Sequence, residues 1–454
     1  MNPKENGFNR RQFISAVAAT GALAMACGGN GGKSPNVEYN LTTLLDKAPE
    51  GQEIKVGVIG CGGRGSGAAM DVLNAADNVQ VIALADVFED RLNSLKGKLA
   101  DQKNNVVPDE NCFVGLDAYE KLLDISEINY VILATPPYFR PMQFEAAINA
   151  KKHVFMEKPV CVDPVGARSV MASSKKAESL GLSVITGTQR RHQHHYVSLF
   201  KQIQSGAIGD IISANVYWNG GQLWYRTLEP GWSDLEWMIR DWVNWMWLSG
   251  DHIVEQHVHN IDVAHWFMGA HPVKAIGFGS RQRRVTGDQY DNFSIDFTLE
   301  DGRHVHSMCR QINGCANSVS EYFSGTQGFS NSSSNGSPES SYLLNKSGEK
   351  IWTYEDAVSA GMPAEPISPY VQEHVDLIWA IRTNNQIVEA ENTATSTLAA
   401  IMGRISAYTG KEVTWEEMMN SDLQVGPKPE DLGLNKTYAM VDNPQIPVPG
   451  TEKR

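Results

Sequence analysis

A glycine-rich segment, Gly60-Cys61-Gly62-Gly63-Arg64-Gly65, directly follows the apolar run Ile54–Ile59. The spacing G-x-G-x-x-G between a buried strand and a helix is typical of a dinucleotide-binding loop. The first glycine permits a tight turn, the second lets the backbone approach a pyrophosphate, and the third packs the helix on the strand. The start of the following helix would offer free N–H groups and the positive end of its dipole to the phosphates.

Asp86 ends the second apolar run, about 20 residues after Gly65, which is the usual distance in such a unit. Its carboxylate would accept hydrogen bonds from the adenosine ribose hydroxyls and would repel a 2′-phosphate, which favours NAD over NADP. The sequence therefore predicts NAD as the cofactor. The alternative is a sheet of the same topology that binds no nucleotide.

Lys158 lies in Glu157-Lys158-Pro159, at the end of the apolar run His153–Met156. A lysine at the end of a buried strand beside a nicotinamide would be partly desolvated. It could bind a substrate hydroxyl or relay the hydroxyl proton. The alternative is a purely structural ion pair between Lys158 and Glu157.

These segments resemble the Gfo/Idh/MocA family, which includes glucose–fructose oxidoreductase and inositol dehydrogenase. The resemblance covers about residues 52–415. The segments that carry it are the glycine loop, Ala134-Thr135-Pro136-Pro137, Glu157-Lys158-Pro159, Gly187-Thr188-Gln189-Arg190-Arg191, the stretch from Glu255 to Asp262, and Gly325-Thr326-Gln327-Gly328.

The resemblance implies that His259 is the catalytic histidine and that Asp262 is its neighbouring aspartate, one helical turn away. A histidine can take a hydroxyl proton while hydride leaves the same carbon, and a carboxylate would orient its ring. Together with Lys158, the predicted catalytic set is Lys158, His259, Asp262 and Glu255. The resemblance adds Thr135, Pro136, Pro137, Glu157, Lys158 and Gln189 to the cofactor contacts, and Arg190, Arg191 and His257 to the substrate contacts.

The chain departs from the family pattern at two of these positions. Glu255 stands where relatives often have Asp, and His257 stands where many have Gly. We therefore expect a narrower and more polar pocket. Among the many histidines no His-Glu-x-x-His motif occurs, so no metal site is predicted.

Seven of the eleven tryptophans fall between residues 218 and 247. Aromatic rings stack on the C–H faces of sugars, but they also dominate cores and interfaces. Both roles stay open for the cluster, with Trp242 predicted to lie in a carbohydrate pocket.

The elements around these motifs alternate between short apolar runs and helical stretches over residues 52–188, which predicts a Rossmann domain with a doubly wound parallel sheet. Residues 189–418 are predicted to form an α+β domain for substrate and oligomer contacts. Phe293, Ile295, Phe297 and Leu299 alternate with polar residues there, which indicates an open, mainly antiparallel sheet. Residues 329–341 read as a Ser/Asn/Gly-rich loop, and residues 419–454 as a polar tail. The fold class is α/β.

Residues 1–26 read as a twin-arginine signal peptide, with Arg10-Arg11 before an apolar stretch. The next residue, Cys27, is either a lipid-anchoring position or the residue after simple cleavage, and residues 27–51 read as a polar tether. We expect an exported, periplasmic protein that is lipid-anchored. The net charge of −13 argues against a nucleic-acid partner.

Location constrains the chemistry, because no free nicotinamide pool is expected in the periplasm. We expect hydride transfer between a secondary alcohol of a sugar or glycoside and a tightly bound NAD that is recycled in place. Two alternatives stay open: a glycoside hydrolase that works by transient oxidation and elimination, and a non-catalytic surface sugar-binding protein. By the resemblance, a homo-oligomer is expected.

Overall fold

The computed structural model describes residues 43–333 and 338–451. The predicted signal peptide, Cys27 and the first part of the predicted tether lie outside the described residues. Within the described ranges, no helix combines the length and apolar character that a membrane span requires.

The first domain is built on a six-stranded sheet in the order β3-β2-β1-β4-β5-β6, and all of its pairs are parallel. Its strands are β1 (Ile54–Ile59), β2 (Val79–Asp86), β3 (Cys112–Val114), β4 (Tyr130–Leu133), β5 (His153–Met156) and β6 (Val184–Thr186). All four residues of β4 are buried, as expected for a strand covered on both faces. The prediction of a Rossmann sheet is confirmed.

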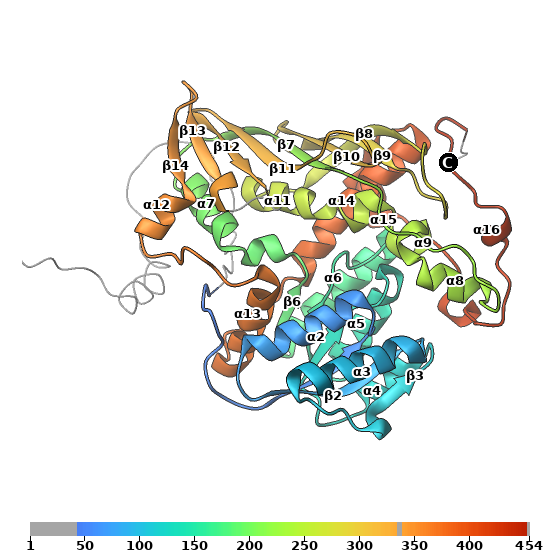
Figure 1. Cartoon of the computed structure of the whole chain (residues 1–454). Coiled ribbons are helices and arrows are strands. Elements are labelled where there is room, and N and C mark those ends of the chain that lie inside the picture. The colour runs from blue at the N-terminus through green and yellow to red at the C-terminus, as the bar shows by residue number, and fades with distance from the viewer. Residues whose placement is uncertain (1–42, 334–337, 452–454) are drawn as a thin grey trace, which may run out of the picture.

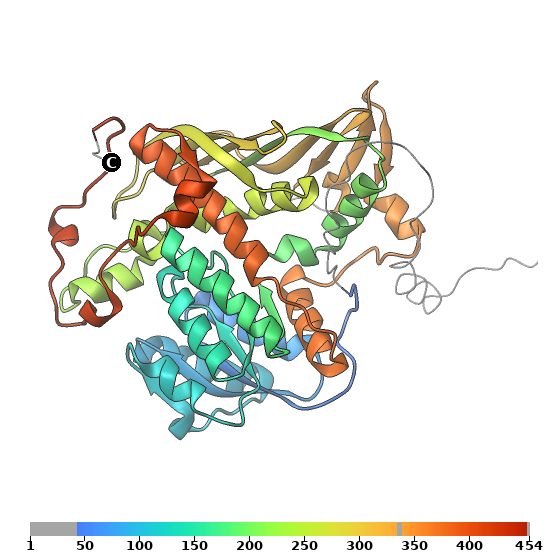
Figure 2. The same ribbon diagram turned by 180° about the vertical axis from the view of Figure 1, so that it is seen from behind.

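Helices cover both faces of this sheet. Helices α2 (Gly63–Ala75) and α3 (Glu89–Lys103) lie in front of it in Figure 1, and α4 (Ala118–Leu123) follows β3. Figure 2 shows α5 (Arg140–Asn149) and α6 (Pro164–Ser179) in front of the opposite face. Helix α6 begins as the sequence predicts, because the Asp163 carboxylate accepts the N–H of Gly166 at 2.8 Å and Pro164 occupies the first helical position.

The second domain holds a nine-stranded sheet in the order β14-β13-β12-β11-β7-β10-β9-β8-β15. Its strands are β7 (Ile211–Gly220), β8 (Pro272–Ser280), β9 (Asn292–Leu299), β10 (His304–Gln311), β11 (Ser318–Gly325), β12 (Gly328–Ser332), β13 (Tyr342–Asn345), β14 (Lys350–Thr353) and β15 (Val413–Thr414). Only the β7–β10 pair among these is parallel, so the predicted, mainly antiparallel sheet is confirmed.

Helices cover the side of this sheet that faces the first domain (Figure 1). They include α7 (His194–Gln204), α10 (His252–Glu255), α11 (Val258–Met268), α12 (Tyr354–Ser359) and α14 (Ala390–Thr409). The inward residues of β9 are buried, whereas the outer face carries exposed apolar side chains, including Ile276, Phe278, Met308, Tyr322 and Phe329.

The predicted loop at residues 329–341 is wrong in its first part. Residues 328–332 form strand β12, which pairs with both β11 and β13. Ser330 and Ser332 are buried there, and the Ser332 hydroxyl donates to Glu321 at 2.7 Å. Small polar residues read as a loop from composition alone, but a hydrogen-bonding partner inside the domain lets them alternate in a strand.

Helix α13 (Pro369–Thr383) follows the second sheet in sequence but packs against α2 of the first domain. Val375, Leu377 and Ile378 share one hydrophobic cluster with the core residues of β1. Helix α14 then crosses back and lies between the two sheets (Figure 1). The chain therefore crosses between the domains more than once.

The C-terminal segment, predicted as a polar tail, follows helix α15 (Trp415–Asn420) and packs along α8 (Asp234–Arg240) and α9 (Met246–Ser249) (Figure 1). It includes α16 (Ala439–Asp442). The Tyr438 N–H donates to Asp234 at 2.8 Å, and Leu432, Leu434 and Val441 pack against the cluster formed by α8 and α9. The apolar residues of this segment are spread among prolines and charged residues. Its average composition is therefore polar and does not indicate that it packs on the second domain.

Candidate active site

A cavity of about 430 Å³ lies at the carboxyl ends of β1, β2 and β4, with the glycine loop along one wall. Gly60 has φ +94°, and a Cβ there would lie 2.7 Å from the backbone of Ala134 and Thr135. A Cβ on Gly65 would meet the Gly60 carbonyl oxygen at 1.8 Å, so the helix packs on the strand only with glycine. A Cβ on Gly63 would meet nothing within 4 Å and one on Gly62 would meet only the end of the Arg91 side chain at 3.8 Å, which leaves room for a pyrophosphate at the N-terminus of α2. The loop therefore fits a dinucleotide.

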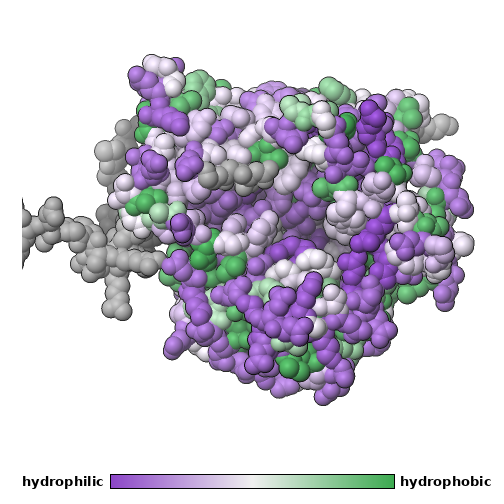
Figure 3. All heavy atoms as spheres, viewed as in Figure 1, coloured by the Kyte–Doolittle hydropathy of each residue, from purple (hydrophilic) through white to green (hydrophobic). Residues whose placement is uncertain are grey.

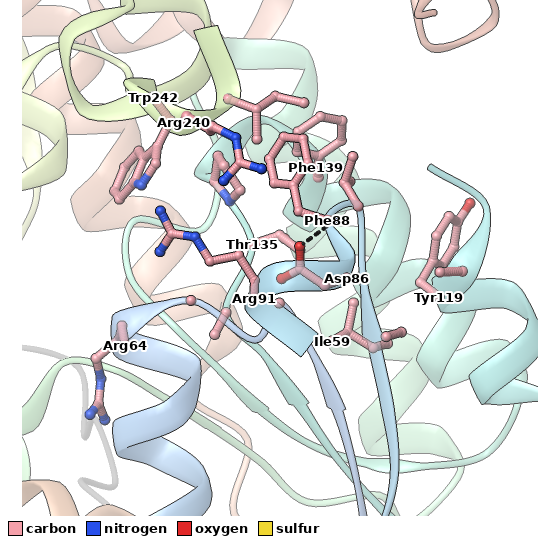
Figure 4. Close-up of a pocket in the computed structure, with 18 of the residues that line it drawn as sticks. Ile59, Arg64, Asp86, Phe88, Arg91, Tyr119, Thr135, Phe139, Arg240 and Trp242 are labelled. Carbon is pink, nitrogen blue, oxygen red and sulfur yellow. Dashed lines mark hydrogen bonds between the residues drawn. The ribbon is translucent and has the colours of Figure 1, made fainter. Parts of the chain in front are cut away.

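Asp86 lines the same cavity at the end of β2 (Figure 4). One carboxylate oxygen accepts the Cys61 N–H at 2.6 Å and the other accepts the Phe88 N–H at 2.8 Å. Burial raises the pKa of Asp86, and the two backbone hydrogen bonds oppose that rise. Each oxygen keeps a further lone pair that can accept from a ribose hydroxyl.

The other predicted cofactor residues fall into two groups. Thr135 and Pro136 line the cavity, and Pro137 begins a buried 3₁₀ turn beside it. Arg64 lines the cavity as well, but its guanidinium is bound to the carboxylates of Glu157 and Asp71, and Figure 4 shows it directed away from Asp86.

Glu157, Lys158 and Gln189 do not line this cavity. Gln189 is buried, and its Oε1 has no hydrogen-bond partner among the described residues.

Arg140, which stands where relatives commonly have His and was not among the predicted site residues, positions the Thr135 loop. Its guanidinium donates to the Thr135 carbonyl at 2.6 Å and to the Pro159 carbonyl at 2.6 Å. These two bonds tie the Thr-Pro-Pro segment to the Glu-Lys-Pro segment. An arginine near the first turn of a helix gives no such signal in sequence, because its partners are backbone carbonyls.

Lys158 pairs with Glu255 across the two domains, and the alternative Lys158–Glu157 ion pair is wrong. The Lys158 ammonium lies 2.9 Å from Glu255 Oε1 and also donates to the Glu255 carbonyl oxygen. The side chains are only 11% and 7% exposed, so the pair is nearly dry. Glu157 instead binds Arg64, which lies on α2.

His259 is buried on α11, and its ring stacks on that of Trp218 with a centroid separation of 5.6 Å. Its Nδ1 has no hydrogen-bond partner within the described parts of the chain. Burial lowers the pKa of His259 well below its usual value, and the cations Lys158 and Arg190 lower it further. The ring is therefore neutral at physiological pH and can accept a proton.

Asp262 does not orient His259, which corrects the expected carboxylate–histidine pair. Its oxygens accept from Arg191 Nε and Nη2, both at 2.8 Å, and from the Ser396 hydroxyl at 2.8 Å. Residues one turn apart share a helix face, but a bidentate arginine from the segment that follows β6 competes for the carboxylate. Asp262 and Arg191 therefore hold α11 against the segment that follows β6.

Arg190 and His257, which were also predicted to contact the substrate, belong to a buried hydrogen-bond network in the second domain. Arg190 pairs with Glu321, which also accepts from Tyr196, Asn260 and Ser332. Glu321 is the missed member, and an acidic residue at an inward position of a strand was its only sequence signal.

His257, predicted as a substrate contact, is also part of this packing. It is fully buried, and its ring contacts Ser307 Oγ at 2.7 Å and Asn260 Oδ1 at 3.3 Å. The Gly-to-His departure thus fills the space between α11 and β10.

The tryptophans of the cluster lie in different surroundings. Trp245 and Trp247 are buried in packing, Trp218 faces His259, and Trp242 lines the nucleotide cavity. Trp242 therefore contacts the cofactor side of the site. Figure 3 shows a hollow between the two domains, with mainly hydrophilic residues around it.

Across the described ranges, no group of three or more His, Cys, Asp or Glu residues is arranged to hold a metal ion. Many of the histidines are instead enclosed by packing. Burial lowers the pKa of His257 and of His265 to about 3 each, and that of His153 to about 4.

Residues 54–186 match the oxidoreductase family with an NAD-binding Rossmann fold, and residues 196–329 match the Gfo/Idh/MocA C-terminal domain. The two matches follow one another and together cover more than half of the chain. The chain therefore belongs to the Gfo/Idh/MocA family, and its first domain is that family's NAD-binding Rossmann domain.

Among curated relatives, myo-inositol 2-dehydrogenase of Thermotoga maritima is 26% identical over 227 residues, which are 50% of this chain and 58% of that protein. Inositol 2-dehydrogenase of Rubrobacter xylanophilus is 26% identical over 259 residues, which are 56% of this chain and 64% of that protein. The chain thus spans less than two thirds of the length of these relatives.

Solved structures support the fold over a larger part of the chain. Scyllo-inositol dehydrogenase from Lactobacillus casei, with bound NAD(H) and scyllo-inositol, has a TM-score of 0.59 and 20% identity, covering 80% of this chain and 99% of that one. Aldose-aldose oxidoreductase from Caulobacter crescentus, complexed with glycerol, has a TM-score of 0.62 and 16% identity, covering 80% and 100%.

The burial of His257 predicts a pH dependence of stability. Its native pKa of about 3 lies below the value of about 6.5 in an unfolded chain, so unfolding takes up a proton as the pH falls below about 6.5. The contribution of His257 to the free energy of unfolding is therefore complete above about pH 6.5 and is lost as the pH falls. His257→Asn should reduce the loss of unfolding free energy between pH 7 and pH 5 by about 2 kcal/mol. Urea denaturation at both pH values measures it.

The matched control is His304→Asn on the outer face of the sheet, where the His304 side chain is 54% exposed. This variant should keep the wild-type pH dependence. An equal loss of unfolding free energy between pH 7 and pH 5 in the two variants would show that burial of His257 does not cause the pH dependence. A loss in both variants as large as that in wild type would show the same.

Proposed function

We propose that this protein is an NAD-dependent oxidoreductase that transfers hydride between a secondary alcohol of a sugar or polyol and the nicotinamide. One observation carries the proposal: the Lys158 ammonium, held by Glu255, and the neutral imidazole of His259 come from different domains and lie close enough for the lysine charge to lower the pKa of the histidine. The relatives named above are inositol dehydrogenases, which supports a ring-shaped polyol or sugar as substrate.

The cradle of Gly60, Gly62 and Gly63 with Asp86 would hold NAD, which supplies a hydride acceptor when bound. Two N–H groups of Lys158 are used by Glu255, which leaves the third for a substrate hydroxyl oxygen. His259 accepts the hydroxyl proton as the carbon–hydrogen bond releases its electron pair as hydride. The cation of Lys158 stabilises the negative charge that develops on that oxygen.

The centroids of the Trp218 and His259 rings lie 5.6 Å apart, and Trp218 is partly exposed, so it can offer an aromatic surface to a sugar. In an exported protein the cofactor has to be retained and re-reduced or re-oxidised in place. A second substrate that accepts the hydride closes such a cycle, and so does the return of hydride to the same sugar after cleavage of a glycosidic bond.

Removal of either proton-handling group should stop the redox step without removing the nucleotide. In Lys158→Ala and His259→Ala we expect loss of hydrogen exchange between a sugar carbon and the cofactor by a factor of at least 100, because a general acid–base group contributes about 10²–10⁴ in rate. Deuterium loss from labelled sugars, followed by mass spectrometry, measures the exchange. The same method, applied to denatured protein, measures bound NAD(H).

The control His304→Ala lies on the far face of the sheet and should exchange at the wild-type rate. Wild-type exchange in Lys158→Ala and His259→Ala would contradict the proposed roles. A wild-type protein that binds a sugar but neither contains nor binds NAD would instead be a sugar-binding module. Release of an aglycone during exchange would identify the glycoside-cleaving form of the reaction.

We also propose export by the twin-arginine route and lipid attachment at Cys27, on the motif Arg10-Arg11 and the apolar stretch that precedes the cysteine. Twin-arginine export carries folded proteins, so a cofactor bound before export travels with the chain. Arg10→Lys with Arg11→Lys should leave at least nine tenths of the protein in the cytoplasm by cell fractionation, whereas Lys4→Gln should not. Export of the double-lysine variant at the wild-type level would contradict the twin-arginine route. The variant Cys27→Ser tests lipid attachment separately.

The exposed face of the nine-stranded sheet supports a homo-oligomer. Phe278 on β8 is 70% exposed and Ile276 beside it is 53% exposed, so an apolar surface is open to a second copy of the chain. Phe278→Glu should weaken self-association and lower the mass found by analytical ultracentrifugation. Val106→Glu, at a position 65% exposed in the first domain, is the control and should leave the mass unchanged. Equal masses in all three proteins would contradict this interface.

A further inference from the structure

The nucleotide cavity is completed by a segment of the second domain. Residues 221–245, called here the clasp segment, follow β7 and contain α8. This segment contributes Trp224, Arg226, Ile239, Arg240 and Trp242 to the same cavity that Gly62 and Asp86 line from the first domain. Figure 4 shows Trp242 and Arg240 opposite Asp86 and Arg91.

Arg240 fastens the clasp segment to the first domain. Its Nη2 and Nη1 lie 2.8 Å and 3.0 Å from the two carboxylate oxygens of Asp90, at the start of α3. The same guanidinium lies 4.0 Å from the centre of the Phe88 ring, next to the backbone that binds Asp86. A bidentate pair combined with stacking on an aromatic ring favours arginine over lysine at this position.

The clasp segment is also braced internally. The Asp241 carboxylate is fully buried and accepts the Arg226 N–H and the Asn244 side-chain amide, both at 2.7 Å. The Trp237 indole donates to the Arg226 carbonyl at 2.7 Å. From outside, the C-terminal segment packs on α8 through Tyr438. The clasp segment is therefore held in shape by its own hydrogen bonds and by the C-terminal segment.

We propose that the clasp segment is part of the cofactor site, where it covers the adenosine half of NAD and is held there by the Arg240–Asp90–Phe88 contact. The cavity runs from the glycine loop to Asp86 and Phe88, and Lys158 and His259 do not line it. The wall that the segment adds therefore lies on the adenosine side. Indole and guanidinium groups favour the faces of a nucleobase.

This inference rests on the proposed NAD-dependent function and deepens it, since it names the groups that slow cofactor release. A cofactor enclosed by two domains dissociates only when the contact between them opens. Arg240 and Asp90 act here as positioning residues, whereas Trp242 and Trp224 form the wall itself.

The test is the rate at which bound NAD leaves the full-length protein. Purified protein is saturated with NAD and chased with isotopically labelled NAD, and exchange is followed by mass spectrometry. Asp90→Asn should speed release about threefold, because the Asp90 side chain is 60% exposed and a single exposed partner contributes little. Arg240→Ala, which removes the ion pair and the stacking together, should speed release at least tenfold.

Glu236→Gln is the matched control, because Glu236 binds the same guanidinium at 2.9 Å through a contact that lies within α8. It should stay within twofold of wild type. Equal release rates in wild type and Arg240→Ala would overturn the inference. So would equal acceleration in all three variants, which would reflect loss of α8 rather than of the contact.

Fragments of the cofactor provide a second readout. Arg240→Ala and Trp242→Ala should weaken binding of ADP, which carries only the adenosine half, and should leave binding of nicotinamide mononucleotide unchanged by calorimetry. Equal weakening of both fragments would contradict the assignment to the adenosine half. Fast release from wild type would contradict cofactor retention in the proposed function, while the ratio of variant to wild-type rates would still decide the role of the clasp segment.

Discussion

The ion pair between Lys158 and Glu255 joins the two domains at the point where the chemistry is proposed. Both side chains are almost dry, so the desolvation cost of each charge has to be offset by a close partner. Glu255 supplies both its carboxylate and its backbone carbonyl to Lys158, which requires α10 to sit directly over the end of β5. Loss of either partner would leave a charge buried between the domains. The relative position of the two sheets is therefore coupled to the position of the reactive lysine.

Most of the first domain could be predicted because its sequence signals are local. Short β-branched runs, a glycine loop and a Pro-started helix each depend on neighbours within a few residues, and β1 and β5 begin and end where the apolar runs do. The second domain was harder. Strand β12 consists of small polar residues, and its burial depends on Glu321 in another strand. The tail packs on α8 by contacts more than 200 residues apart in sequence, which no local pattern encodes.

The candidate site shows the same division. The roles of the glycines and of Asp86 could be predicted from their spacing. A tight turn at Gly60 and the close approach of the helix to the strand at Gly65 leave few choices of residue. The partners of Asp262, His257 and Trp242 did not follow, because each is set by competition between groups from distant segments. Asp262 shares a helix face with His259 but is taken by Arg191, which offers two hydrogen bonds where a histidine offers one. Spacing along a helix identifies possible partners, and the fold decides among them.

Burial of His259 has opposite consequences for stability and for the proposed chemistry. A buried imidazole surrounded by Lys158 and Arg190 is costly to protonate, so it weakens the fold at acid pH. The same cations keep the ring neutral at physiological pH, so that one of its nitrogens can accept a proton. When a hydroxyl gives up that proton, the negative charge on its oxygen faces the positive charges that had disfavoured the imidazolium. In a site with little water these interactions are strong, so the features that destabilise a charged histidine also favour an alkoxide beside it.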